Sequence, residues 1–175
     1  GALWAQKRWR AERVMVLDFD AHHGDGTEEI LADRPGVRFL SLFQWPLFPH
    51  RRMEPTPSNA VLSPLPAGAG GEDIRNVVEN VWLPEIDKFQ PDLMILSAGF
   101  DAHCEERIAQ LKAGEMDYAC VTRLLVEASF AYCEGRLVSV LEGGYELRSL
   151  ARSVFTHLQG LIRNPLPAET CKDPN

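Results

Sequence analysis

The order of hydrophobic and polar positions predicts buried strands that alternate with amphipathic helices. Short apolar runs rich in β-branched residues predict strands at residues 14–17, 37–42, 59–62, 93–96 and 137–141. Apolar residues at helical spacing predict helices at residues 3–13, 27–31, 72–89, 117–133 and 147–163. Thr27 is expected to cap the second helix. Alternating strands and helices are typical of an α/β fold with a mostly parallel sheet, and we predict that class.

Three of the predicted strands run directly into polar or glycine-containing segments. After the first strand, Asp18, Asp20 and His22 alternate, so in an extended chain their side chains share one face. Gly99-Phe-Asp101 follows the fourth strand, and Gly143-Gly-Tyr145 follows the fifth. Because ligands of parallel sheets bind outside the carboxyl ends of the strands, we expect these segments to converge at one edge.

Two carboxylates and an imidazole on one face form a ligand set that suits a divalent metal such as zinc. Asp and His also gather at strand ends as loop residues that bond to the backbone. The local pattern supports these two interpretations about equally. A catalytic zinc site normally has three protein ligands and one open position, so a third ligand from another strand end would favour the metal.

Composition narrows the class of protein. The 175 residues fit one domain, and 45% hydrophobic with 25% charged residues predicts a globular, soluble chain. A net charge of -7 argues against non-specific binding to nucleic acid and fits a cationic substrate. No apolar run approaches the roughly 20 residues of a membrane span, so no membrane association is expected. The cysteines lack metal-site spacing, which predicts reduced thiols and a cytoplasmic location: Cys104, Cys120, Cys133 and Cys171.

The sequence also divides into segments of different character. Residues 1–163 carry all the predicted elements and are expected to form one partial domain. Residues 164–175 are polar, contain prolines and are expected to form a flexible C-terminal tail. Residues 43–71 hold six of the twelve prolines and predict a long, largely irregular connection, of a length usually associated with function.

Four segments, in order and at similar spacing, resemble motifs of the zinc-dependent histone deacetylases. They are Leu17-Asp-Phe-Asp-Ala-His-His-Gly-Asp-Gly-Thr27, Ser41-Leu-Phe-Gln-Trp-Pro-Leu-Phe-Pro49, Ser97-Ala-Gly-Phe-Asp-Ala102 and Leu141-Glu-Gly-Gly-Tyr-Glu-Leu147. Within this family the chain resembles bacterial deacetylase-like amidohydrolases, with acetylpolyamine amidohydrolases nearby. The resemblance covers residues 2–162 and implies a three-layer, arginase-like α/β fold with a mostly parallel sheet.

The resemblance assigns roles residue by residue. It implies that Asp20, His22 and Asp101 bind Zn²⁺ or another divalent metal, which supplies the third ligand that the local pattern lacked. It implies that Tyr145 donates a hydrogen bond to the substrate carbonyl and that Phe48 forms an aromatic wall of the acyl-lysine channel. The glycines expected to line that channel are Gly99, Gly143 and Gly144.

Relatives of this kind also carry a potassium ion beside the zinc. The resemblance places its counterparts at Asp18 and Ser41 and at the backbone carbonyls of Asp20, His22 and Leu42. These residues are therefore expected to bind K⁺ or to support the metal ligands.

One departure from the family pattern is large. Family members carry two adjacent histidines, acting as general base and acid, well before the Asp-x-Asp-x-His strand. Only about twenty residues precede that strand here and none is a histidine, so we expect a fold truncated at its N-terminus. Asp18 and Asp25 match the carboxylates that orient the missing pair. A buried carboxylate without a partner is costly, so each is expected to meet a metal, water or a new partner.

Two functions follow as alternatives. The first is a zinc-dependent amidohydrolase fragment that acts on N-acetyl-lysine or an acetylated polyamine and is weak or inactive alone. The second is a non-catalytic half-domain that binds metal or assembles. In either case we expect a homo-oligomer or association with the missing N-terminal part, because absent strands would expose apolar surface. His23 is expected to support the metal strand, and surface or loop positions are expected for His50, His103 and His157.

Overall fold

The computed structural model describes residues 1–50 and 56–162, and its centre is a five-stranded sheet. The strands are β1 (Val14–Asp18), β2 (Val37–Gln44), β3 (Ala60–Leu65), β4 (Leu93–Ala98) and β5 (Leu137–Leu141). They pair in the order β3-β2-β1-β4-β5, and every pairing is parallel. This arrangement confirms the predicted α/β class. The predicted tail at 164–175 lies outside the described residues, as do residues 51–55 of the long connection.

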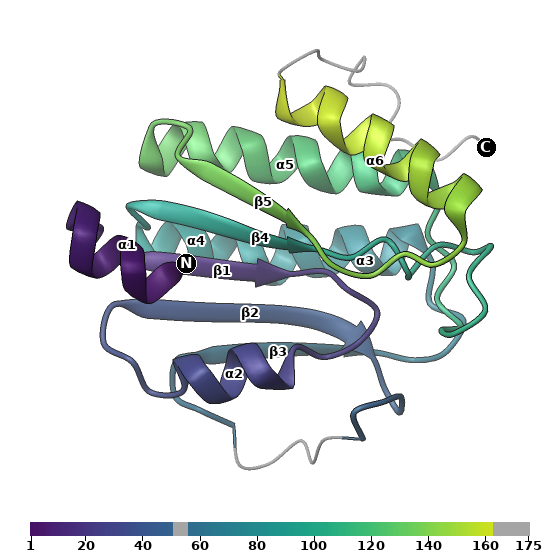
Figure 1. The fold of residues 1–175 in the computed structure, drawn as a ribbon, viewed down its shortest axis with the longest axis horizontal. Coiled ribbons are helices and arrows are strands. Elements are labelled where there is room, and N and C mark those ends of the chain that lie inside the picture. The colour runs from purple at the N-terminus through teal and green to yellow at the C-terminus, as the bar shows by residue number, and fades with distance from the viewer. Residues whose placement is uncertain (51–55, 163–175) are drawn as a thin grey trace.

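Helices cover both faces of the sheet (Figure 1). They are α1 (Ala2–Trp9), α2 (Asp25–Leu31), α3 (Gly71–Val77), the π-helix η1 (Val78–Trp82), α4 (Leu83–Phe89), α5 (Glu115–Cys133) and α6 (Leu147–Leu161). In Figure 1, α1 and α2 lie in front of the sheet, α3, α4 and α5 lie behind it, and α6 lies alongside α5. The molecule therefore has three layers.

Alternate side chains of β1 pack against the helices on the two opposite faces of the sheet. Met15 and Leu17 belong to the larger core, which β1 shares with α3, α4 and α5. Val14 and Val16 belong to a smaller core beneath α1 and α2. Because successive side chains of a strand point to opposite faces, one short apolar run can bury both sides of the sheet.

Two details of the predicted helices are wrong. Helix α2 begins at Asp25 and its N-cap position is Gly24, so Thr27 lies inside the helix rather than at its cap. The helix predicted over 72–89 contains a π turn, η1, directly before Pro84 in the first turn of α4. Proline lacks an N–H and its ring crowds the preceding turn, so a regular α-helix cannot continue unchanged through this position.

Buried polar groups also differ from the predictions. His103 lies in the connection between β4 and α5, as the expected loop position required, but its side chain is buried. His157 is buried on α6, although a surface or loop position was expected for it. The ring of His157 contacts Thr122 Oγ1 at 2.6 Å and Ser139 Oγ at 2.8 Å. Cys120 is disulfide-bonded, so the prediction of reduced thiols is wrong for this residue.

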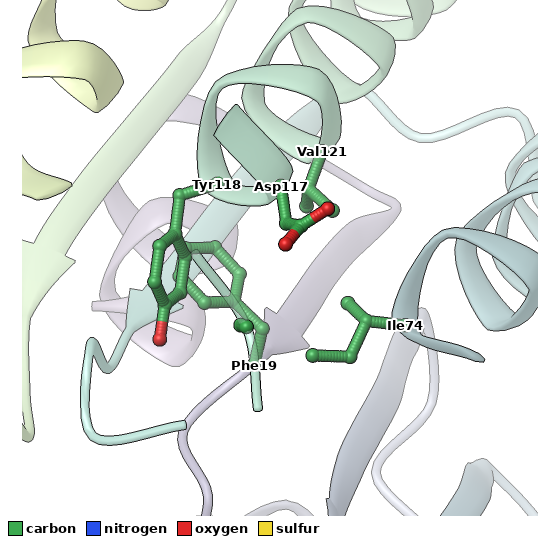
Figure 2. A pocket seen from close by; sticks show the side chains of 6 residues that line it. Phe19, Ile74, Asp117, Tyr118 and Val121 are labelled. Carbon is green, nitrogen blue, oxygen red and sulfur yellow. The ribbon is translucent and has the colours of Figure 1, made fainter. Parts of the chain in front are cut away.

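A small cavity lies between α3, α5 and Phe19 (Figure 2). It measures about 10 Å³, and Ile74, Asp117, Tyr118 and Val121 contribute to its lining. A space of this size holds about one water, so it is a packing defect rather than a substrate pocket. No helix in the described part of the chain combines the length and the apolar character that crossing a membrane requires.

His157 gives the fold a pH dependence. Burial lowers its pKa from 6.5 to about 4. Between pH 4 and pH 6.5 the histidine is therefore mainly protonated in the unfolded chain and mainly neutral in the folded protein. Stability is therefore expected to fall as the pH drops through this range, by roughly 2 kcal/mol at pH 5 relative to pH 7.5. Urea unfolding of the wild type and of His157→Gln at both pH values measures this. An equal loss in both proteins would contradict the assignment.

Candidate metal centre

Three of the predicted site residues converge beyond the carboxyl ends of β1 and β4. Asp20 and His22 follow β1, and Asp101 follows β4, the neighbouring strand. Each offers a ligand atom, and these atoms all lie within 4.8 Å of one another. His22 Nδ1 lies 3.1 Å from Asp20 Oδ1 and 2.8 Å from Asp101 Oδ2. Asp101 lies 81 residues after Asp20 and 79 residues after His22 in the sequence. The structure thus brings a distant carboxylate beside the carboxylate and imidazole that follow β1.

Backbone groups hold the two carboxylates in place. Asp101 Oδ1 accepts a hydrogen bond of 2.8 Å from the amide of Ala21, so the loop after β4 is tied to the loop after β1. Asp20 Oδ2 accepts one of 2.9 Å from the amide of Gly143, which follows β5. The other oxygen of Asp20 accepts one of 2.8 Å from the amide of His22. The ends of three strands are therefore locked to one another through the candidate ligands.

The ionisation of these groups shows how densely negative charge is concentrated. Hydrogen bonds to Asp101 and Asp20 raise the pKa of His22 to about 10. Burial raises the pKa of Asp101, whose side chain is completely enclosed. Burial acts in the same direction on Asp20, but its hydrogen bonds with His22 and Gly143 outweigh it and lower the pKa. The two carboxylates therefore favour a positive charge between them. A proton on His22 can supply that charge, and a divalent cation fits this set of oxygen and nitrogen ligands.

Two predicted channel glycines pack directly against the carboxylates. A Cβ atom on Gly99 would overlap Asp20, and one on Gly143 would overlap both Asp20 and Asp101. Gly144 has a φ of +135° and is covered by Leu150. Gly99 and Gly143 therefore require glycine because the backbone approaches the carboxylates too closely for any side chain, whereas Gly144 requires it because of its positive φ and its contact with Leu150.

The residues predicted to support the centre or to bind potassium lie in different environments. Asp18 and Ser41 are both buried and face each other across the β1–β2 pairing. Burial raises the pKa of Asp18, and its Oδ1 accepts a 3.1 Å hydrogen bond from the amide of Asp20. Leu42 is buried in the larger core. Asp25 is exposed at the start of α2, so the expected cost of a buried, unpaired carboxylate does not arise there.

His23 is buried and packs between the elements around the candidate ligands. Its Nδ1 lies 3.2 Å from Ser41 Oγ and its Nε2 lies 2.8 Å from Glu28 Oε2. Its ring packs on Phe43 at a centroid distance of 4.7 Å. Both ring nitrogens thus face side chains of the surrounding elements.

An open pocket of about 210 Å³ lies beside the candidate ligands. Its lining is mainly polar and includes the carboxylates of Asp18, Asp20 and Glu142. The other lining residues are His22, His23, Gly24, Thr27 and Ser97. A small molecule that carries a positive charge suits this lining better than an anion does.

Tyr145 and Phe48 are both exposed, at 63% and 68%. The pKa of the Tyr145 hydroxyl is raised by partial burial and by the nearby charges of Asp101 and Asp20. Tyr145 also lines a wide surface pocket of about 540 Å³ beyond β5. No aromatic wall of a channel is complete around Phe48 within the described residues.

Glu106 is a structural contributor that the sequence interpretation missed. Its Oε1 accepts hydrogen bonds from the amides of Tyr145, at 2.6 Å, and Glu146, at 2.8 Å. This carboxylate therefore fixes the backbone that carries Tyr145. The sequence shows two adjacent carboxylates in Cys104-Glu-Glu-Arg107, but no local pattern links them to the backbone about 40 residues later.

A second group of potential ligands, His103, Glu105 and Glu115, fits a metal poorly. His103 Nδ1 accepts a hydrogen bond of 3.1 Å from the amide of Glu105, which leaves the proton of a neutral ring on Nε2. Arg152 forms ion pairs with both Glu105 and Glu115, so its positive charge already occupies the two carboxylates. The group is therefore an ion-pair network.

Comparison with known proteins assigns the chain to one group. The model of the histone deacetylase domain family matches residues 1–161. Histone deacetylase 10, chloroplastic, of Oryza sativa subsp. japonica is 34% identical over 99% of this chain and 40% of that protein. Polyamine deacetylase HDAC10 of Mus musculus is 32% identical over 93% of this chain and 26% of that protein.

A solved structure agrees with this result. The crystal structure of the HDA15 HD domain superposes with a TM-score of 0.82 at 30% identity, over 94% of this chain and 48% of that one. The chain thus has the arginase-like fold of histone deacetylase domains. It spans less than half the length of these relatives.

The tight packing of Gly99 predicts the effect of a substitution. Gly99→Ala is expected to displace Asp20 and destabilise the protein by roughly 1–3 kcal/mol, as overpacking of a dense interior does. Gly26→Ala is the matched control, because a Cβ atom there meets nothing within 4 Å. Thermal unfolding of the two variants measures the difference. Equal stability of both would contradict the close approach at Gly99.

Proposed function

The chain belongs to the histone deacetylase domain family, and we propose that it is part of a zinc-dependent amidohydrolase. The reaction is the hydrolysis of an acetyl amide on a lysine side chain or a polyamine. The observation that carries the proposal is the convergence of Asp20, His22 and Asp101, with all ligand atoms within 4.8 Å. Three protein ligands beside an open pocket match the needs of a catalytic zinc site.

The donor set fits the ion. When bound, zinc would polarise the amide carbonyl and lower the pKa of a water molecule toward neutrality. Asp20 and Asp101 would bind through the oxygens that now face His22, while their remaining oxygens stay bonded to the amides of Gly143 and Ala21. These bonds orient the ligands before the ion arrives.

We assign the other predicted residues to positions around this ion. Tyr145 would donate its hydroxyl proton in a hydrogen bond to the oxyanion that develops on the substrate. The two adjacent, buried residues Asp18 and Ser41, together with the carbonyl of Leu42, would bind K⁺. Phe48, Gly99, Gly143 and Gly144 would border the acyl-lysine channel.

The proposed activity of this chain alone is weak or absent. Reaction requires a base that takes a proton from water, and the family uses a separate pair of histidines for it. The adjacent histidines of the described residues are His22, a candidate ligand, and His23, which contacts Ser41 and Glu28. The chain also spans less than half of its relatives, so the remaining catalytic groups would come from outside it.

A non-catalytic function is the alternative. The exposure of Tyr145 and Phe48 favours it, because neither side chain is enclosed as a channel would require. In this case the chain would bind the metal, or assemble, without hydrolysing an amide.

The lining of the pocket supports a substrate with a positive charge. Asp18, Asp20 and Glu142 all contribute carboxylates to it. A polyamine that keeps free amines after acetylation presents such charge, and one relative is named a polyamine deacetylase. Acetyl-lysine within a basic peptide has the same property.

Zinc binding tests the centre independently of activity. The protein is expected to bind one zinc ion per chain, measured by calorimetry after removal of metal. Asp101→Asn is expected to weaken binding at least roughly 100-fold, because it replaces a direct ligand while keeping the shape. Asp87→Asn, at an exposed position on α4, serves as the control and should bind like the wild type. Unchanged affinity in Asp101→Asn would overturn the proposed centre.

Amide hydrolysis then separates the two functions. With zinc bound, any release of acetate from an acetyl-lysine or acetylpolyamine reporter is expected to fall about 100-fold in Tyr145→Phe, with unchanged zinc affinity. Zinc binding without hydrolysis in the wild type would favour the non-catalytic alternative for the isolated chain.

A further inference from the structure

Glu106 is a carboxylate outside the candidate metal ligands that reaches the segment carrying Tyr145. It lies in the connection between β4 and α5, shortly after Asp101. Its Oε1 accepts one hydrogen bond of 2.6 Å from the amide of Tyr145 and another of 2.8 Å from the amide of Glu146. Hydrogen bonds to an ionised carboxylate are roughly twice as strong as bonds between neutral groups. One side chain therefore holds two consecutive peptide groups.

The backbone before Tyr145 has little stiffness of its own. Two consecutive glycines precede it, and glycine adopts conformations that other residues rarely adopt. The first of them, Gly143, is fixed because its amide donates a hydrogen bond of 2.9 Å to Asp20. After Tyr145, the side chain of Glu146 caps the start of α6. Tyr145 lies between these two fixed points, and its own amide bonds to Glu106.

The connection that carries Glu106 is fixed by its own hydrogen bonds. The amide of Glu106 donates to the carbonyl of His103 at 2.9 Å. The amide of Cys104 donates to the carbonyl of Ala113 at 2.8 Å, which ties the beginning of the connection to its end. Asp101, a candidate metal ligand, belongs to the same connection. This short segment therefore presents a metal ligand at one position and the anchor of the loop after β5 at another.

We propose that Glu106 is a positioning residue, which sets where the Tyr145 hydroxyl lies relative to the metal. This inference rests on the proposed role of Tyr145 as a hydrogen-bond donor to the substrate. Glu106 acts through the backbone of Tyr145 rather than on the reacting atoms. Because Glu106 and Asp101 belong to one connection, a shift of that connection moves the metal ligand and the tyrosine together. A misplacement of about 1 Å can cost roughly 100-fold in rate, so this coupling matters for the reaction.

Glu105, the adjacent carboxylate, provides a matched control. It pairs with Arg152 of α6 at 2.6 Å. Both carboxylates therefore join the connection after β4 to the segment after β5. Glu105 reaches the helix, whereas Glu106 reaches the two peptide groups before it. An effect specific to Glu106 can thus be separated from a general loosening of α6.

Hydrogen exchange of single amides tests the anchor without metal or substrate. In Glu106→Ala, the amides of Tyr145 and Glu146 are expected to exchange about tenfold faster or more, because their acceptor is removed. Glu106→Gln keeps the shape and a neutral acceptor oxygen, so it should give intermediate rates. Glu105→Ala is expected to leave both rates unchanged. The amide of Gly143, which bonds to a candidate ligand, is the internal reference and should exchange equally in every variant. Nuclear magnetic resonance of the labelled protein measures these rates.

A binding cycle then tests the positioning role. Acetohydroxamic acid chelates zinc and presents a carbonyl oxygen, so it serves as the probe for the zinc-loaded protein. Tyr145→Phe is expected to weaken its binding about tenfold, through the lost hydrogen bond. Glu106→Ala is expected to weaken it by about threefold to tenfold with unchanged zinc affinity, whereas Glu105→Ala should not weaken it. The combination of Tyr145→Phe with Glu106→Ala should bind no more weakly than Tyr145→Phe alone, because Glu106 acts through Tyr145. Calorimetry measures each affinity.

The outcomes separate this inference from the proposed function. Unchanged exchange at Tyr145 in Glu106→Ala, equal acceleration at Gly143, or additive losses in the combined variant would each overturn the positioning role and leave the metal centre intact. Failure to bind zinc, or equal probe affinity in the wild type and Tyr145→Phe, would overturn the proposed function and the positioning role with it.

Discussion

The parallel pairing of β1 with β4 is the constraint on which the candidate centre depends. Asp18 lies opposite Ser97 at the last pair of this ladder, so both strands end at the same level. The short turns that follow then bring Asp20 and Asp101 together, and the bond from Ala21 to Asp101 joins the two turns. Because side chains alternate along a strand, a shift of one residue in this register would point the carboxylate-bearing segments to different faces.

Burying several carboxylates near one another is costly, and the protein compensates each of them differently. Burial keeps Asp18 closer to its neutral form by raising its pKa. Asp20 receives hydrogen bonds from the amides of His22 and Gly143, which stabilise its charge. Asp101, the most enclosed of the three, relies on Ala21 and on the imidazole of His22. Backbone amides thus maintain the geometry whether a proton or a cation supplies the positive charge.

Much of the fold could be predicted from the sequence, because β-branched runs and helical spacing are local signals. The alternation of Asp18, Asp20 and His22 also predicted one edge of the site. The strand ends predicted that the segment of Asp101 converges at that edge, but its role as a ligand needed the family resemblance, since no local pattern links residues that lie 80 positions apart along the chain. The π turn before Pro84 and the role of Glu106 depend on tertiary context, which local spacing does not contain.

Helix α6 shows most clearly why local patterns fail. Its buried residues are Ser149, Ser153 and His157, whereas Phe155 and Leu158 are more than half exposed. Leu150 and Val154 pack against the larger core, but amphipathic reasoning would also turn Phe155 and Leu158 inward. The orientation of the helix also includes the hydrogen bond between His157 and Ser139 and the close packing of Gly160 on Thr122.

The close approach of Gly99 and Gly143 to the carboxylates also limits how the site could be transferred to another scaffold. Copying Asp20, His22 and Asp101 onto the strand ends of a different parallel sheet would reproduce the ligand types but not the space they occupy. The two neighbouring strand exits would need bare backbone at the matching positions, so that the amide of one could reach the carboxylate of another. The smallest transferable unit is therefore a set of three strand exits with their glycines, and a designer who grafted the side chains alone would obtain a crowded and misaligned centre.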